Sequence, residues 1–273
     1  MTPSDREIDA LRRLATEVAE EAAALLTTNL HRERRQVETK SSGTDMVTEM
    51  DRASEALVAD RLLAARPHDA VVGEEGADRQ GTSGVRWIVD PLDGTTNYLY
   101  RYPGFNGSIA AEVQVGEQRA VVAGAVVDPL HTTTYSAALG AGATANGELL
   151  RLSGPPVPLQ RALVSTGFSY DPDRRRRQAQ VLTTVLPAVR DIRRQGAAAV
   201  DLCLVASGRV DAFYEKGLAA WDHSAGALIA TEAGAVVGDL DGGPGGAQFL
   251  LAGRPELFDH LRALLVRAGA AEA

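Results

Sequence analysis

Apolar residues at helical spacing characterise the first part of the chain. A capping-box sequence, Ser4-Asp5-Arg6-Glu7, stands directly before them. The apolar residues that follow are Ile8, Leu11, Leu14, Ala15, Val18, Ala22, Leu25 and Leu26. This pattern predicts a long amphipathic helix. After a Ser-Ser-Gly break, Thr48 or Asp51 caps a second predicted helix, which ends before Pro67.

From Val71 onward the pattern changes to short runs of β-branched and other apolar residues. The strands predicted from these runs are 71–72, 87–89, 108–115, 120–127 and 132–137. Gly, Pro or Asp-Pro breaks separate several of them. Breaks of this kind are typical of a meandering sheet in which consecutive strands are neighbours.

The second half of the chain alternates between helix and strand patterns. Asn146-Gly147 predicts a turn, and Ser153-Gly154-Pro155-Pro156 is the favoured boundary between two lobes. The predicted elements beyond it are strand 162–166, helix 174–186, helix 197–207 with Gly208 as its stop, strand 210–214, helix 222–233, strand 249–252 and helix 255–266. We therefore expect one catalytic domain over 1–273, with an α+β lobe over about 1–152 closely joined to an α/β lobe over about 153–273.

Composition narrows the class of protein. With 273 residues, 45% of them apolar, the chain can bury an ample core, which excludes disorder. The longest apolar runs fall far short of the ~20 residues that a membrane helix needs, and the N-terminus is polar, so we expect no membrane span and no signal peptide. The single cysteine, Cys203, lies in an apolar stretch and has no partner for an internal disulfide, which indicates a core residue in a reducing cytoplasm.

The balance of charge is acidic. The chain has 28 Lys and Arg against 36 Asp and Glu, for a net charge of -8. A nucleic-acid-binding surface normally has a basic footprint, so we expect no nucleic-acid partner. Carboxylates that converge on one place would instead attract divalent cations.

Three groups of acidic residues lie at predicted strand ends or at a predicted helix start, where their side chains could converge. Gly73-Glu74-Glu75-Gly76 follows a short apolar strand. The block Trp87-Ile88-Val89-Asp90-Pro91-Leu92-Asp93-Gly94-Thr95-Thr96-Asn97 begins as a β-run. Asp222 stands at the start of an apolar helix. Taken one at a time, these are ordinary features: a surface Glu pair, an Asp-Gly turn and a helix N-cap. Together they favour a functional site, because an unpaired carboxylate behind a buried strand is costly.

The block around Asp90 predicts metal-assisted chemistry. Pro91 is expected to stop the strand ladder and Asp93-Gly94 to turn the chain, which leaves two carboxylates and the Leu92 carbonyl near one point. Hard oxygen ligands of this kind suit Mg²⁺. The N–H groups of Gly94 and Thr95 would be available to a phosphate if a helix or turn begins there. Adjacent metal ligands and phosphate donors are what metal-assisted phosphate-ester hydrolysis requires.

With these motifs, the chain resembles the inositol monophosphatase family, within the lithium-sensitive, magnesium-dependent phosphatases. The resemblance rests on residues 73–75, 87–97, 221–226 and 231–235, and it extends upstream to 40–51. The order and spacing of these motifs agree over almost the whole chain. The resemblance implies a layered α-β-α-β-α sandwich, consistent with the α+β and α/β lobes above.

The resemblance also implies a set of metal ligands. Glu74, Asp90 and the Leu92 carbonyl would hold one Mg²⁺, while Asp90, Asp93 and Asp222 would hold a second, with Asp90 bridging the two. Two or three ions are expected in all.

Catalytic and substrate-binding residues follow from the same resemblance. Thr95 paired with Asp51 would orient and help deprotonate the attacking water, and Glu74 is counted with them as catalytic. The implied substrate-binding residues are Asp93, Gly94, Thr95, Gly196, Ala197, Ala198, Glu215 and Asp222. The chain departs from the family pattern at Ala197, where a hydroxyl residue is common, and at Ala219-Ala220, where a histidine-containing pair is usual. Both departures fall at positions that contact substrate, so they leave the identity of the alcohol more open than the phosphatase chemistry.

The expected function is therefore Mg²⁺-dependent hydrolysis of a small polyol phosphomonoester, with myo-inositol 1-phosphate as the first choice. Histidinol phosphate, fructose 1,6-bisphosphate and 3′-phosphoadenosine phosphates are alternatives within the superfamily. From other classes, a non-catalytic metal-binding regulatory module and an oligomeric scaffold with a protein partner stay open. The resemblance further implies lithium sensitivity and a homodimer.

Basic residues allow more than one interpretation. The run Arg174 to Arg177 is interpreted as a solvated helix start. Arg193-Arg194, just before Gly196, either steers a phosphomonoester or lies at a subunit contact. Lys40 either balances charge near the metal cluster or is a surface lysine.

Overall fold

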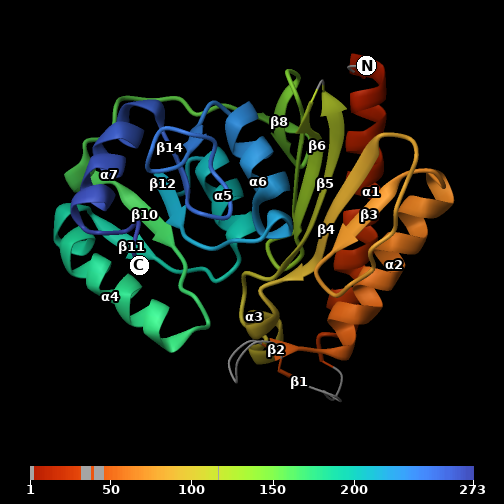
Figure 1. The fold of residues 1–273 in the computed structure, drawn as a ribbon, viewed down its shortest axis with the longest axis horizontal. Helices are drawn as coiled ribbons and strands as arrows, with labels where there is room; N and C mark the ends of the chain where they lie inside the picture. Colours follow the sequence, from red (N-terminus) through yellow and green to blue (C-terminus); the bar gives the residue numbers. More distant parts are fainter. Residues whose placement is uncertain (1–2, 32–37, 40–45, 116) are drawn as a thin grey trace.

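Two β-sheets separated and flanked by helices make up the computed structural model of the protein (Figure 1). It describes residues 3–31, 38–39, 46–115 and 117–273, so Lys40 and its neighbours up to residue 45 lie outside the described residues. The layers alternate as α-β-α-β-α, which confirms the expected sandwich.

The larger sheet has seven strands in sequence order. They are β3 (Ala70–Gly73), β4 (Val85–Asp93), β5 (Asn106–Val115), β6 (Gln118–Asp128), β7 (Thr133–Ala138), β8 (Gly142–Ala145) and β9 (Glu148–Leu150). All neighbours pair antiparallel except β3 and β4, which are parallel. Strand β5 is buried over its first eight residues, because helices cover both faces of the sheet.

The smaller sheet has the order β11-β10-β12-β14-β13. Its strands are β10 (Leu163–Thr166), β11 (Asp191–Arg193), β12 (Ala212–Glu215), β13 (Val236–Gly238) and β14 (Leu250–Gly253). A separate two-stranded ladder joins β1 (Glu38–Thr39) to β2 (Met46–Val47).

Seven α-helices complete the described fold. They are α1 (Asp5–Asn29), α2 (Glu49–Ala65), α3 (Thr95–Tyr100), α4 (Pro172–Val185), α5 (Ala198–Ala206), α6 (Ala220–Glu232) and α7 (Pro255–Arg267), with 3₁₀ turns η1 (Leu159–Arg161) and η2 (Leu186–Ala188). None of the helices in the described ranges is long and apolar enough to cross a membrane.

Side chains alternate between the two faces of each strand, so successive residues of one strand contact different layers of helices. On β4, Trp87 packs with the outer layer of α1 and α2, while the next residue, Ile88, faces α5 and α6 between the sheets. On β14, Leu250 faces the middle layer, and Leu251 joins the core beneath α4 and α7. Cys203 of α5 is fully buried with a free thiol, as expected of a core residue.

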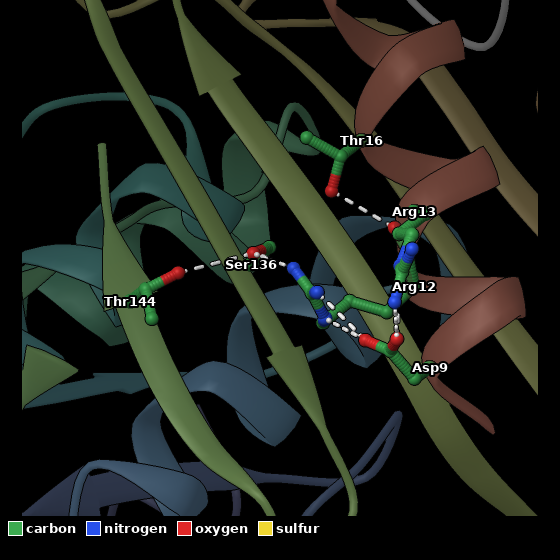
Figure 2. A network of polar contacts seen from close by, with 6 residues as sticks. All are labelled: Asp9, Arg12, Arg13, Thr16, Ser136 and Thr144. Carbon is green, nitrogen blue, oxygen red and sulfur yellow. Dashed lines mark hydrogen bonds and ion pairs between the residues drawn. The ribbon is translucent and has the colours of Figure 1, made fainter. Parts of the chain in front are cut away.

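A polar bridge ties α1 to the far part of the larger sheet (Figure 2). Arg12 Nη1 donates to Ser136 Oγ of β7 at 3.2 Å, and Ser136 contacts Thr144 of β8 at 3.2 Å. Arg12 also donates to Asp9 Oδ1 from Nε at 3.2 Å and from Nη2 at 2.7 Å. The bridge joins the first helix to strands more than a hundred residues away in sequence.

Both helix starts expected near the N-terminus are confirmed. The side chains of Ser4 and Glu7 form the reciprocal capping box of α1. For α2, the structure decides between the two caps: Thr48 is the N-cap, and Asp51 is the third helical residue, whose carboxylate accepts the Thr48 N–H.

The expected end of β4 at Pro91 is wrong. The strand continues to Asp93, with its register shifted between the pairs Asp90–Ser108 and Asp93–Asn106. A proline lacks the N–H that a ladder requires, and a local irregularity accommodates it without ending the strand.

Candidate active site

One cavity of about 260 Å³ gathers the residues implied as metal ligands. Its lining includes Glu74, Asp90, Leu92, Asp93 and Asp222, together with Gly94 and Thr95. They come from the turn after β3, the end of β4, the start of α3 and the start of α6. Chain segments far apart in sequence therefore meet at one point, as the motifs predict.

The irregularity in β4 shapes the floor of this cavity. Asp90 is 2% exposed, and its Oδ1 accepts the Leu92 N–H at 3.2 Å. Asp93 Oδ2 accepts from Asn106 Nδ2 of β5 at 2.9 Å and from the Ala199 N–H of α5 at 3.1 Å. The register shift thus turns both carboxylates toward the cavity and ties Asp93 to both neighbouring elements.

Crowding of buried acids raises the pKa values of these carboxyl groups. Burial, followed by the charges of Glu74, Asp93 and Asp222, raises the pKa of Asp90 well above its usual range. Burial also raises the pKa of Asp93 to about 7, although the hydrogen bonds from Asn106 and Ala199 act in the opposite direction. Repulsion of this kind is relieved by a bound cation.

The expected pairing of Thr95 with Asp51 is present in the structure. Thr95 Oγ1 donates to Asp51 Oδ1 at 2.8 Å and lies 3.3 Å from the Leu92 carbonyl. Asp51 is 2% exposed, and its Oδ2 accepts from Thr48 N at 2.7 Å and Thr48 Oγ1 at 2.5 Å. The capping box of α2 therefore fixes the carboxylate that holds the Thr95 hydroxyl at the edge of the cavity.

Asp222 lies in the first turn of α6 but is not its N-cap. Ala219 takes that position, and its N–H donates to Asp222 Oδ2 at 2.6 Å. This contact holds the carboxylate back against the start of its own helix, beside the cavity.

The turn that presents Glu74 depends on Glu55, a residue that the sequence analysis missed. Glu55 is 3% exposed on α2, and its two carboxylate oxygens accept the N–H groups of Glu75 and Ala77, each at 2.7 Å. A Cβ at Gly73 would lie 2.4 Å from Glu55 Oε2, so a side chain there would displace the Glu55 carboxylate. The signal that could have identified Glu55 is its place as a charged residue on the buried face of α2.

A second cavity of about 170 Å³ adjoins the first and contains the implied substrate residues Gly196, Ala197, Ala198 and Glu215. Asp93 and Asp222 line both cavities. Burial, with the charge of Asp201 next in importance, raises the pKa of Glu215 to about 8. The first cavity therefore opens directly into a space for the rest of a substrate.

Aromatic and basic residues also line the second cavity, and of these the sequence analysis connected only Arg194 with the substrate, as one of two interpretations. They are Phe168, Tyr170, Arg174, Arg194 and Lys216. Arg174 lies in the first turn of α4, as expected of a helix start, but its side chain is half-buried and lines the cavity. Nothing in the local sequence distinguishes Arg174 from Arg175 to Arg177. Its role comes from the orientation of α4 against Gly217.

The donor set fits a hard divalent cation by its chemistry. Every donor is an oxygen, and the carboxylates repel one another. Within the described parts of the chain, however, no three His, Cys, Asp or Glu side chains are placed so that they could hold a metal ion as they stand. Asp93 and Asp222 instead each direct an oxygen to a backbone N–H.

Comparison with known proteins agrees with this geometry. The inositol monophosphatase family profile matches residues 7–269. An inositol-1-monophosphatase of Mycobacterium bovis is 44% identical over 98% of this chain and 97% of that protein. A Nus factor SuhB of Escherichia coli is 36% identical over 84% of this chain and 85% of that protein.

A solved structure supports the same assignment. The extragenic suppressor protein suhB of Bartonella henselae superimposes with a TM-score of 0.86 at 34% identity, over 94% of this chain and 98% of that one. The chain belongs to the inositol monophosphatase family, whose members are phosphomonoester hydrolases.

Proposed function

We propose that this protein hydrolyses a small polyol phosphomonoester with Mg²⁺ as its cofactor, and that myo-inositol 1-phosphate is its preferred substrate. The family is generally metal-dependent. The observation that supports the proposal most is the pair of adjoining cavities, one lined by acidic residues and one large enough for an alcohol, which share Asp93 and Asp222.

Two or three Mg²⁺ would be held by the ligand sets that the resemblance implies. Glu74, Asp90 and the Leu92 carbonyl form one set, and Asp90, Asp93 and Asp222 form the other. Bound Mg²⁺ neutralises phosphoryl oxygens, lowers the pKa of water and stabilises the leaving alkoxide. Asp93 and Asp222 each accept a backbone N–H in this structure, so they would give up these hydrogen bonds in order to hold an ion.

Proton transfer is the task of Thr95 and Asp51. The Thr95 hydroxyl accepts a proton from the attacking water as it passes its own proton to Asp51 Oδ1, 2.8 Å away. Asp51 is held for this role by Thr48, and Glu74 by the turn that Glu55 orders.

Phosphate would lie against the backbone of Gly94 and Thr95. Gly94 adopts φ 85°, and a Cβ there would lie 2.8 Å from the Gly104 carbonyl, so glycine permits this turn. N–H groups of the first turn of a helix lack acceptors within it, which leaves them free to bind an anion.

The alcohol would occupy the second cavity, where Glu215 accepts hydrogen bonds from substrate hydroxyls beside the backbone of Gly196 to Ala198. Kinetic comparison of myo-inositol 1-phosphate, histidinol phosphate, fructose 1,6-bisphosphate and 3′-phosphoadenosine 5′-phosphate tests this assignment. The highest kcat/KM is expected for myo-inositol 1-phosphate. A clear preference for another ester would overturn the choice of alcohol and leave the phosphatase chemistry in place.

Lithium sensitivity, a homodimer and a cytoplasmic location belong to the same proposal. Millimolar Li⁺ is expected to inhibit turnover by occupying one of the metal sites, and size-exclusion chromatography with light scattering should show twice the mass of the chain. The free, fully buried Cys203 fits a reducing compartment.

A role with a protein partner is a second candidate function, favoured by the name of the Escherichia coli relative, Nus factor SuhB. A pull-down with an inactive Asp93→Asn variant separates this role from catalysis. Retention of a specific partner by the inactive protein would support it. The alternative of a non-catalytic module is set aside, because members of the family are phosphomonoester hydrolases.

A further inference from the structure

A buried asparagine contacts the acidic cavity from the neighbouring strand. Asn106 is the first residue of β5, and its side chain is 0% exposed. It pairs in register with Asp93 of β4, directly after the register shift that follows Asp90. The strand pairing therefore places an amide group beside a carboxylate that lines both cavities of the site.

Asparagine is an unfavourable residue at this position. The first eight residues of β5 are buried, and asparagine is depleted in strands. The Oδ1 atom of Asn106 is buried and has no hydrogen-bond partner among the residues that the structure describes. An amide oxygen buried without a partner lowers the stability of a fold. The contribution of Asn106 must therefore come from the other end of its amide, the Nδ2 group.

This Nδ2 group holds one oxygen of Asp93. It donates to Asp93 Oδ2 at 2.9 Å, and the Ala199 N–H donates to the same oxygen at 3.1 Å. Within the described part of the chain, the other carboxylate oxygen, Asp93 Oδ1, accepts no hydrogen bond. Both donors thus act on one side of the carboxylate, which leaves Oδ1 available to an ion.

The two donors differ in how far they can follow the carboxylate. The Ala199 N–H belongs to the first turn of α5, so its position is fixed by the helix backbone. The Asn106 amide lies at the end of a side chain and can turn together with Asp93. Once Asp93 gives up the Ala199 N–H in order to hold an ion, the amide would be the remaining donor to Oδ2. The Asn106 hydrogen bond therefore matters more with the ion bound than without it.

We propose that Asn106 is a positioning residue for Asp93: its amide holds Oδ2 while Oδ1 faces the metal ion, and this contact raises the affinity of the site for Mg²⁺. Loss of such support behind a metal ligand typically weakens metal binding by about ten- to a hundredfold. The inference rests on the proposed function, because it takes Asp93 as a ligand of the metal.

Direct measurement of Mg²⁺ binding tests the proposal independently of activity. Asn106→Ala removes the amide, and Asn106→Val does so while filling most of the space with a side chain that favours strands. By isothermal titration calorimetry, the Mg²⁺ dissociation constant should rise at least about tenfold in both variants. The Mg²⁺ concentration for half-maximal turnover should rise by a similar factor, whereas kcat at saturating Mg²⁺ should stay within about threefold of the wild type.

The stability of the metal-free protein separates positioning from a structural role. With a chelator present, Asn106→Ala loses one donor to Asp93 but also loses the unpartnered oxygen. Its unfolding midpoint should therefore lie within about 4 °C of the wild type. The rise of the midpoint on addition of Mg²⁺ should be smaller than in the wild type. An equal drop of the midpoint with chelator and with Mg²⁺ would show a purely structural role and overturn the proposal.

Ser136→Ala is the matched control. Ser136 is 4% exposed in the same sheet, accepts a hydrogen bond from Arg12, and lines neither cavity of the site (Figure 2). Its loss removes a buried polar contact without touching Asp93, so the Mg²⁺ dissociation constant should not change. A rise equal to that of Asn106→Ala would show a general effect of destabilisation and would overturn the proposal.

The wild-type protein separates the two levels of the inference. If it binds Mg²⁺ and hydrolyses myo-inositol 1-phosphate, but Asn106→Ala binds Mg²⁺ as tightly or more tightly, the role of Asn106 alone is wrong. If the wild type neither binds Mg²⁺ nor shows Mg²⁺-dependent hydrolysis, the proposed function itself fails, and the role of Asn106 fails with it.

Discussion

The Thr95 hydroxyl donates a 2.8 Å hydrogen bond to Asp51 Oδ1 across 44 positions of sequence. The acceptor is almost fully buried and is fixed by the N-cap of its own helix, whereas the donor lies at the edge of the acidic cavity. The start of α2 and the start of α3 are thus joined at the point where water would be activated.

Removal of the Thr95 hydroxyl should slow the chemical step. Thr95→Ala is expected to lower kcat by about a hundredfold to ten-thousandfold, because a positioned proton acceptor contributes that much. Thr95→Ser retains the hydroxyl and serves as the control, with kcat within about tenfold of the wild type.

The Asp51→Asn variant tests whether the two residues act as one unit. Its loss of kcat should match that of Thr95→Ala, and the double variant should be little worse than either single one. Multiplicative losses would show that the hydrogen bond has no joint catalytic role.

The pH dependence of stability should report the buried acids. Because the pKa of Asp93 is raised from 3.8 to about 7 in the folded state, the unfolded state binds fewer protons between those values. The free energy of unfolding of the metal-free protein should therefore fall as pH rises from about 4 to about 7, and level off above that for this group.

Asp93→Asn should flatten this decline. Urea unfolding in the presence of a chelator, at several pH values across that window, measures the effect, which is at most about 4 kcal/mol for this residue. If the free energy of unfolding falls equally steeply with pH in the wild type and the variant, the raised pKa of Asp93 is contradicted.

The Glu55 contact predicts an indirect effect on metal binding. In Gly73→Ala, the new methyl group meets Glu55 Oε2 at 2.4 Å, so the turn that presents Glu74 must shift. The Mg²⁺ concentration for half-maximal activity should rise about ten- to a hundredfold, as for other losses of support behind a metal ligand. Gly246→Ala places its methyl group in open space and should leave that concentration unchanged.

Long, strongly patterned elements could be predicted from the sequence, and short ones could not. Helix α1 and strands β5 and β6 have enough apolar residues in register to identify them. Strand β8 is Gly142-Ala143-Thr144-Ala145, and β11 has two charged residues in three. These strands exist because neighbouring strands offer them hydrogen bonds, which local sequence does not reveal.

The candidate site divides in the same way. Asp90, Asp93 and Asp222 lie within compact motifs, so the sequence and its resemblance to the family could predict them as site residues. Glu55 and Arg174 could not, because each acts on a segment far away in sequence, and only packing of α2 against β3 and of α4 against Gly217 brings them there.

Phosphate release from myo-inositol 1-phosphate by the purified protein is the most direct test of the central claim. The assay compares the wild type with Mg²⁺, the wild type with a chelator, and Asp93→Asn with Mg²⁺. We predict turnover that requires Mg²⁺ and falls by several orders of magnitude in the variant, because a metal ligand is lost. Near-normal turnover of Asp93→Asn, or turnover unaffected by the chelator, would contradict the account.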